Sequence, residues 1–241
     1  MASRDSDERG LETVVAGRLR AWLGRARDAV MQPFRQWGGM PDATAVYSEQ
    51  QSWNDDVDTI LTHVGQIALR AWSEATDVPP VSRHAFIMAS LADTYNFLVR
   101  IPDEVANLVF AEITDAVNAG ADVDGVAARV DKVLSWTGSE RWTGRARTIA
   151  WTETTRARGA GTLAAGAEQA RVTGRVLTKE WRSRHDEKVR VNHMEADGQR
   201  VPFWAPFLVG GEYLQFPGDP TGSPENVINC RCDLVIRDEV S

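Results

Sequence analysis

The sequence predicts an α+β protein, in which a mainly α-helical N-terminal two thirds precedes a small, loop-rich α+β module. Two observations support this fold class. Apolar residues recur every three or four positions up to about residue 170, whereas strand-like runs alternate with turn-forming dipeptides from about residue 172. We therefore expect a helical region at 1–135, built as a bundle or as extended hairpins, and a C-terminal module at 136–241.

The helical region contains a series of amphipathic stripes separated by helix-breaking residues. The first stripe ends at Pro33 and at Gly38-Gly39, which predicts a hinge there. Asp122 is a suitable N-cap for the fifth helix. Thr137 to Glu140 has the spacing of a capping box and predicts a sixth helix that continues to about residue 170. The first five stripes cover residues 11–30, 57–72, 87–98, 105–117 and 126–134.

The C-terminal module is predicted to be rich in loops. Strand-like runs occupy 175–181, 212–216 and 232–236, and Asp197-Gly198 is a turn signal. Prolines and glycines make an irregular loop of 217–224. A module of this size cannot bury a large core. We therefore expect an additional stabilising cross-link, and a bound metal ion is the candidate.

Charge and hydropathy exclude some classes of protein. The 241 residues carry a net charge of −7, and no apolar run is long enough for a membrane-spanning helix. The polar N-terminus does not resemble a signal peptide, so we expect synthesis in a reducing cytoplasm. These features favour a protein that acts without a membrane.

The charge is unevenly distributed along the chain. Residues 37–135 hold 5 basic and 15 acidic side chains, a net of −10, whereas 136–179 hold 8 and 3, a net of +5. The simplest interpretation is charge complementarity within the fold. The alternative is a local contact with DNA phosphates. The arginines for that contact are Arg141, Arg145 and Arg156, with Arg147 and Arg158 as neighbours.

Glu153 is placed on the buried face of the sixth helix by a period of 100° per residue. A buried carboxylate needs a partner, which predicts a structural ion pair with an arginine of the module, Arg190 or Arg231. The alternatives are a catalytic acid or base, and an error in the phase assigned to the helix.

A second group of side chains has metal-binding chemistry. It comprises His185, Asp186, His193, Cys230 and Cys232. Thiolate and imidazole are preferred zinc ligands, although the Cys-x-Cys spacing is tighter than that of a regular zinc finger. The open alternatives are a structural zinc site, two reduced thiols beside a hydrogen-bonded histidine, and a metal-dependent nuclease or processing enzyme that uses His193 with Asp186.

Over about residues 140–236 the chain resembles the phage Mu protein F-like family of minor head proteins, also called phage head morphogenesis proteins. The order of the matching residues is long and unusual. They are Ile149, Thr152-Glu153, Lys179, Trp181, Asp186, Val189-Arg190, His193, Asp197-Gly198, Phe207, Phe216-Pro217-Gly218-Asp219-Pro220 and Ile228-Asn229-Cys230-Arg231-Cys232.

The resemblance implies a minor structural protein of a tailed-phage head that acts by binding and not as an enzyme. It implies a place inside the virion near the portal vertex, reached from the host cytoplasm during assembly. The implied partners are the portal protein, the major capsid or scaffolding protein, and packaged DNA. It also favours a structural zinc ion held by His193, Cys230 and Cys232, with Asp186 or His185 as the fourth ligand.

Overall fold

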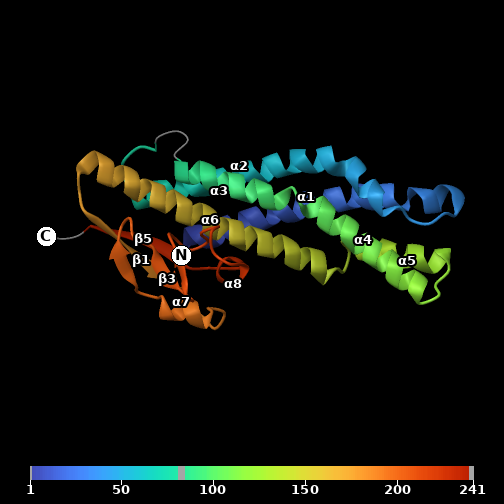
Figure 1. Ribbon diagram of the computed structural model, residues 1–241. Coiled ribbons are helices and arrows are strands. Elements are labelled where there is room, and N and C mark those ends of the chain that lie inside the picture. The colour runs from blue at the N-terminus through green and yellow to red at the C-terminus, as the bar shows by residue number, and fades with distance from the viewer. Residues whose placement is uncertain (1, 81–84, 239–241) are drawn as a thin grey trace. The chain divides into compact units, whose positions relative to one another are not determined.

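Figure 1 shows the computed structural model of the chain, which describes residues 2–80 and 85–238. The predicted α+β class is confirmed, with long helices first and short antiparallel strands in the C-terminal part. The helices are α1 (Ala2–Trp37), the 3-10 helix η1 (Ala43–Glu49), α2 (Gln50–Ala75), α3 (Ala85–Leu98), α4 (Ile101–Asn118), α5 (Val123–Leu134), α6 (Glu140–Thr173), α7 (Val191–Glu195) and α8 (Pro224–Val227). The strands are β1 (Leu177–Arg182), β2 (Arg200–Pro202), β3 (Phe207–Val209), β4 (Glu212–Leu214) and β5 (Asp233–Asp238).

The chain folds into two compact units, and each is assembled from separated segments. Unit 1 consists of Met1–Glu12, Leu61–Thr94 and Thr148–Ser241, and unit 2 consists of Thr13–Ile60 and Tyr95–Arg147. The long helices α1, α2, α3 and α6 therefore contribute residues to both units. The predicted division of the chain at residue 135 stays a prediction.

Unit 2 is a helical unit with a tryptophan-centred core. Trp22 and Trp53 are fully buried with their ring centroids 5.3 Å apart, and the Trp53 indole donates a hydrogen bond to the Leu98 carbonyl at 2.8 Å. The predicted cap of α5 is confirmed, because the Asp122 side chain accepts a hydrogen bond from the Gly125 amide. Among the described residues, no helix is both long enough and apolar enough to cross a membrane.

The ends of two helices differ from their predicted positions. α1 continues through Pro33 and ends at Trp37, before Gly38 with φ +64°. The loss of one backbone donor near the end of a long helix is tolerated, whereas the left-handed glycine ends it. α6 begins at Glu140, and Ser139 accepts the capping hydrogen bond instead of Thr137.

In unit 1, α6 packs on two sides (Figure 1). A Cβ at Gly161 would lie 2.1 Å from the Ala68 carbonyl oxygen of α2, and one at Gly159 would lie 2.5 Å from the Phe216 ring. Positions 159 and 161 point in nearly opposite directions on a helix. Glycine at both positions therefore lets α2 and the C-terminal module approach the same helix closely.

The C-terminal module holds a three-stranded antiparallel sheet, in the order β2-β1-β5, and the β3-β4 hairpin. Its core centres on Trp181. The Trp181 and Phe207 rings meet edge to face, with their centroids 5.5 Å apart. Leu163 of α6 completes this core from the helix side. Aromatic side chains bury a large apolar area each, so these residues contribute strongly to the core of so small a module.

The predicted irregular loop after residue 216 docks onto the backbone of α6. Gly218 has φ +85°, and a Cβ there would lie 2.9 Å from the Arg156 amide nitrogen. The buried Asp219 carboxylate accepts hydrogen bonds from the amides of Gln215 and Thr221. The phenylalanine-proline-glycine-aspartate segment is thus a structural connection that fixes the chain before the two cysteines.

Candidate functional site

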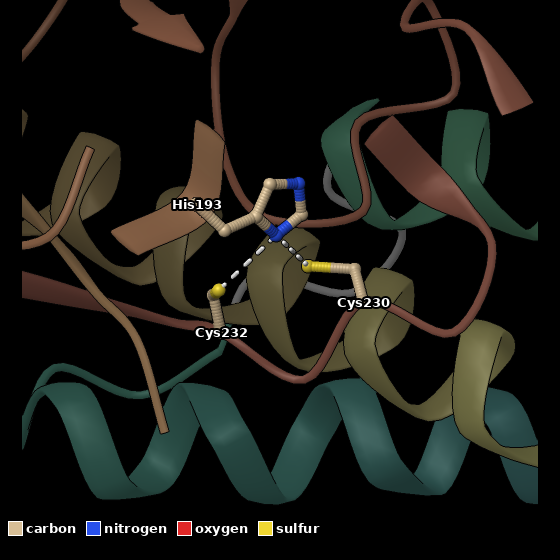
Figure 2. Close-up of side chains that lie close together, drawn as sticks. All are labelled: His193, Cys230 and Cys232. Atoms are coloured by element: carbon tan, nitrogen blue, oxygen red, sulfur yellow. Dashed lines mark hydrogen bonds between the residues drawn. The ribbon is translucent and has the colours of Figure 1, made fainter. Parts of the chain in front are cut away.

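Three side chains with metal-binding chemistry meet inside unit 1, as Figure 2 shows. The Nδ1 atom of His193 lies 3.5 Å from the Cys232 sulfur and 3.7 Å from the Cys230 sulfur. All three residues are buried, at 2%, 3% and 1% exposure for His193, Cys232 and Cys230. Their candidate ligand atoms lie within 4.8 Å of one another. The structure thus brings together the core of the predicted metal site.

Short, irregular segments of the chain set the orientation of these three side chains. His193 lies on the single turn of α7, whose preceding residue Arg190 is extended and lets the helix start abruptly. Asn229 takes a left-handed conformation with φ +57°, which turns the chain into Cys230. β5 begins at Asp233, directly after the second cysteine. The two thiols are therefore held between a tight turn and the start of a strand.

Helix α6 holds this turn through two threonines that lie one helical turn apart. The Thr152 hydroxyl accepts a hydrogen bond from the Asn229 amide at 3.0 Å, and the Thr155 hydroxyl donates to the Cys230 carbonyl. Residues three apart share one face of a helix. The pair therefore fixes the backbone of the first cysteine on α6.

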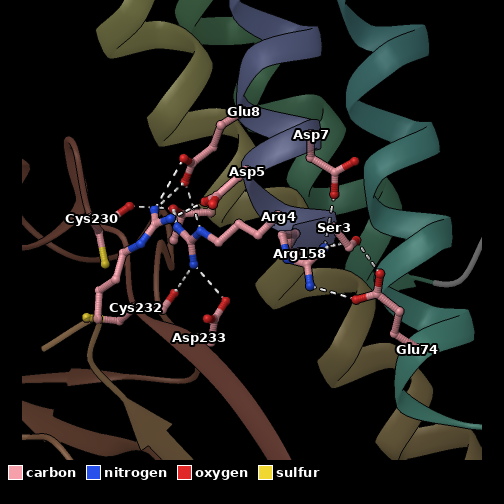
Figure 3. A network of polar contacts seen from close by, with 12 residues as sticks. Ser3, Arg4, Asp5, Asp7, Glu8, Glu74, Arg158, Cys230, Cys232 and Asp233 are labelled. Carbon is pink, nitrogen blue, oxygen red and sulfur yellow. Dashed lines mark hydrogen bonds and ion pairs between the residues drawn. The ribbon is translucent and has the colours of Figure 1, made fainter. Parts of the chain in front are cut away.

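The N-terminal turn of α1 holds the second cysteine, as Figure 3 shows. Arg4 is 3% exposed, and its Nη1 atom donates to the Cys232 carbonyl at 2.9 Å and to Asp233 at 2.7 Å. Its Nε atom donates to Glu8 at 2.9 Å, and Nη2 donates to the Thr155 hydroxyl. A buried guanidinium with this many partners is a strong, geometrically specific contact.

The pKa values of the two thiols are shifted in opposite directions. A hydrogen bond from Cys232 lowers the pKa of Cys230 well below the usual value of a thiol. The pKa of Cys232 is raised, first because it gives that hydrogen bond and second because it is buried. The Trp181 and His193 rings meet edge to face, with their centroids 5.5 Å apart. Two cysteine sulfurs beside an imidazole are the ligand types that a soft metal ion prefers.

The structure does not bring the predicted fourth ligands into this group. The Asp186 carboxylate is half-exposed, and it accepts hydrogen bonds from the Arg231 guanidinium and the Lys188 amide. His185 is exposed, with φ +55°, and its Nε2 atom lies 3.4 Å from Asp197. Each of these two side chains thus has a partner outside the group of three.

Glu153 forms an ion pair, as predicted, but its partner is not one of the predicted arginines. Glu153 is fully buried, and both of its oxygens accept hydrogen bonds from Arg156, at 3.0 and 3.1 Å, while Thr94 donates a further one. The prediction of Arg190 or Arg231 as the partner is wrong. Arg190 donates to the Ile228 carbonyl, and Arg231 binds Asp186.

Arg156 pairs with Glu153 because it lies one turn away on the same helix, so no long-range contact is needed. Burial is the main cause that raises the pKa of Glu153, and the Arg156 charge opposes it. The pair is a buried structural feature of α6, as its predicted role requires, and only its arginine was assigned to the wrong segment.

The arginines predicted for DNA contact have different environments. Arg156 is buried with Glu153, so its guanidinium cannot reach a phosphate. Arg145 forms an ion pair with Glu104 at 2.7 Å, and Arg158 forms ion pairs with Asp7 and Glu74. Arg141 is exposed. Contact of Arg141 or Arg145 with DNA stays a prediction.

Sequence reasoning missed Arg4 entirely. The predicted first helix has its apolar stripe from Leu11 onward, and nothing in the polar N-terminus signals a contact with the end of the chain. Thr152 carried a signal through the Thr152-Glu153 pair of the family resemblance, whereas Thr155 stands in a polar run of the helix and carried none.

The profile of the Phage Mu protein F like protein family matches residues 107–235. The chain belongs to this family. The match spans His193, both cysteines, the two α6 threonines and the loop that docks on α6, so the site lies inside the Mu F-like region. Arg4 lies outside the matched residues. No curated protein and no solved structure matches the chain.

Membership connects the site to phage head morphogenesis, which is the family's function. In this Mu F-like chain the residues that carry the predicted metal chemistry are buried, and they are held by hydrogen bonds to α1 and α6.

Proposed function

We propose that the protein is a minor structural and assembly component of a tailed-phage head, which binds the portal or the inner capsid surface during procapsid assembly. Its place in the mature particle is the head interior near the portal vertex. Family membership over residues 107–235 is the observation that carries this proposal. The protein acts by presenting a folded surface, without turnover of a substrate.

The arrangement of the candidate site supports binding over catalysis. A metal-dependent nuclease needs a histidine and a carboxylate that reach the same water or substrate. Here the His193 nitrogen faces two thiols in the interior, whereas the Asp186 carboxylate is bound by Arg231 on the surface. The two groups proposed for that chemistry therefore have separate partners.

Helix α4 of unit 2 offers a suitable contact surface. Phe110 and Val117 are 49% and 51% exposed, although both are large apolar residues. They lie seven residues apart and so occupy the same face of the helix. Apolar side chains that stay exposed in this way are common at protein interfaces. We assign them to the contact with the portal or capsid.

The test is incorporation into heads when the chain is co-expressed with its cognate portal, scaffolding and major capsid proteins. We expect the wild-type chain to purify with the procapsids, and the double variant Phe110→Ser, Val117→Ser to be incorporated at least about tenfold less. The matched control is Val172→Ser, Val176→Ser, which removes two exposed valines of unit 1 and should leave incorporation unchanged.

Absence of the wild-type chain from procapsids would overturn the proposed function. Normal incorporation of the α4 variant would overturn the assigned surface. Removal of residues 1–135 is not a suitable experiment, because residues 2–12 and 61–94 are parts of unit 1. The enzymatic alternative would be supported by plasmid cleavage with Mg²⁺ or Mn²⁺ that His193→Ala abolishes while the fold is kept. We expect no such cleavage.

A further inference from the structure

We infer that His193, Cys230 and Cys232 bind one zinc ion, through Nδ1 and the two sulfur atoms, and that this ion ties α7 to the segment before β5. This inference is independent of the proposed contact with portal or capsid. It concerns only whether the buried group is a metal centre or a pair of reduced thiols beside a histidine.

The spacing of the three atoms fits a tetrahedral zinc site. Zinc binds sulfur at about 2.3 Å and imidazole nitrogen at about 2.0–2.1 Å, and a tetrahedral angle between them places nitrogen and sulfur about 3.6 Å apart. The observed distances from Nδ1 to the two sulfurs are 3.5 and 3.7 Å. Both nitrogen–sulfur separations thus already match those that a bound ion would require, and all three ligand atoms lie within 4.8 Å of one another.

Hydrogen bonding without a metal satisfies the same group less well. A neutral imidazole has one lone pair, which can accept one good hydrogen bond. Both sulfurs lie within hydrogen-bond distance of the same nitrogen, which can accept a hydrogen bond from only one of them at a time. A metal ion uses the imidazole lone pair and both sulfurs at once. Binding it displaces the thiol protons to solvent.

The chemistry of the ligands selects the metal. Two thiolates and one imidazole are soft and borderline ligands, which favour zinc over magnesium or calcium. Among residues 2–80 and 85–238, no other histidine, cysteine or carboxylate joins the three ligands. The inferred ion would therefore take its fourth ligand from outside the described side chains, and water is the simplest such ligand. A cavity of about 310 Å³, lined in part by Arg4, Cys232 and Asp233, adjoins the site.

The surroundings hold the backbone of the two cysteine ligands, whereas Nε2 of His193 is buried without a hydrogen-bond partner among the described residues. The carbonyls of Cys230 and Cys232 accept hydrogen bonds from Thr155 and Arg4, which fixes the backbone on both sides of Arg231. Such contacts beyond the ligands orient them before the ion arrives. Since the ligands come from α7 and from the segment before β5, the ion would connect two parts of the module that are 37 residues apart.

The test is the metal content and thermal stability of the full-length protein. We expect about one zinc per chain after purification in zinc-containing medium, and a melting temperature that falls by roughly 10 °C when a strong zinc chelator is added. Cobalt in place of zinc should give the intense visible bands of a tetrahedral site and a thiolate charge-transfer band.

Cys230→Ser and His193→Gln should each lower the zinc content and remove the effect of the chelator on the melting temperature. The matched controls are His185→Gln and Asp186→Asn, the two predicted ligands that lie outside the group, and these should keep the ion. If a ligand variant fails to fold, the chelator and cobalt measurements on the wild-type chain decide the question. Wild-type protein that contains no zinc, gives no thiolate band with cobalt and melts unchanged with chelator would overturn the inference.

Discussion

Lys179 is a fully buried lysine in the C-terminal module. Its ammonium group donates to the Gln215 carbonyl and side chain and lies 5.2 Å from the centre of the Phe207 ring. Burial lowers the pKa of Lys179 from its usual 10.5 to about 8, and Asp219 opposes this shift. The charged amine is therefore less favourable inside the fold than in the unfolded chain.

This pKa gives a stability that depends on pH. Between about pH 8 and 10.5 the unfolded chain still holds the Lys179 proton while the folded chain has released it, so folding stability rises with pH in this window. Relative to Lys179→Met, we expect the wild-type free energy of unfolding to increase by up to roughly 3 kcal/mol from pH 7.5 to pH 10. Urea unfolding of both proteins at several pH values measures it. A constant or falling difference would contradict the assignment.

Sequence reasoning identified side-chain chemistry better than side-chain partners. His193, Cys230 and Cys232 stood out because few residue types bind soft metals, and the fold brings them together. The neighbours Asp186 and His185 have the right chemistry, but in the fold they pair with Arg231 and Asp197 instead. Residue type alone does not tell which of several possible partners a side chain will meet.

At the scale of the element, the glycines of helix α6 differ in the space that surrounds them. Gly161 has no room for a side chain, because a Cβ would lie 2.1 Å from the Ala68 carbonyl oxygen. A Cβ added at Gly144 would have no neighbouring atom within 4 Å. The same substitution should therefore have opposite effects at the two sites.

We expect Gly161→Ala to destabilise the protein by roughly 1–3 kcal/mol or more, since α2 must move away from α6. Gly144→Ala should stabilise it by about 0.5–1 kcal/mol, because alanine has the higher helix propensity. Denaturant unfolding of the two variants beside the wild type tests this pair of expectations. Equal effects of the two substitutions would show that the close packing of α2 and α6 is absent.

The long helices were predictable, and the shortest elements were not. Repeated apolar positions identify α2, α4 and α5, because each buries one face. The short elements α7, α8, β2 and β3 have three to five residues each, too few to show a period. Their positions depend on tertiary contacts, such as those that His193 and Asn226 make inside the module.

At the scale of the whole molecule, the N-terminal turn of α1 and the end of the chain belong to one unit. Arg4 and Cys232 are 228 positions apart, and the contact between them joins the first helix to the last strand. Contacts over such a separation cannot be inferred from one sequence, because no local pattern specifies them. The three predicted strand-like runs coincide with β1, β4 and β5, and the contact with the N-terminal turn of α1 was not predicted.

The central claim is that the cysteine pair is closed inside unit 1 by α6 and the N-terminal turn of α1. The most direct measurement is the alkylation rate of Cys230 and Cys232 in native protein treated with chelator, read by mass spectrometry for wild type, Arg4→Met and the exposed control Arg20→Met. We predict slow alkylation in wild type and control. We predict at least about tenfold faster alkylation in Arg4→Met, because loss of the buried guanidinium lowers the free energy of local opening. Wild-type thiols that react as fast as those of the unfolded chain, or an Arg4→Met rate equal to wild type, would contradict the account.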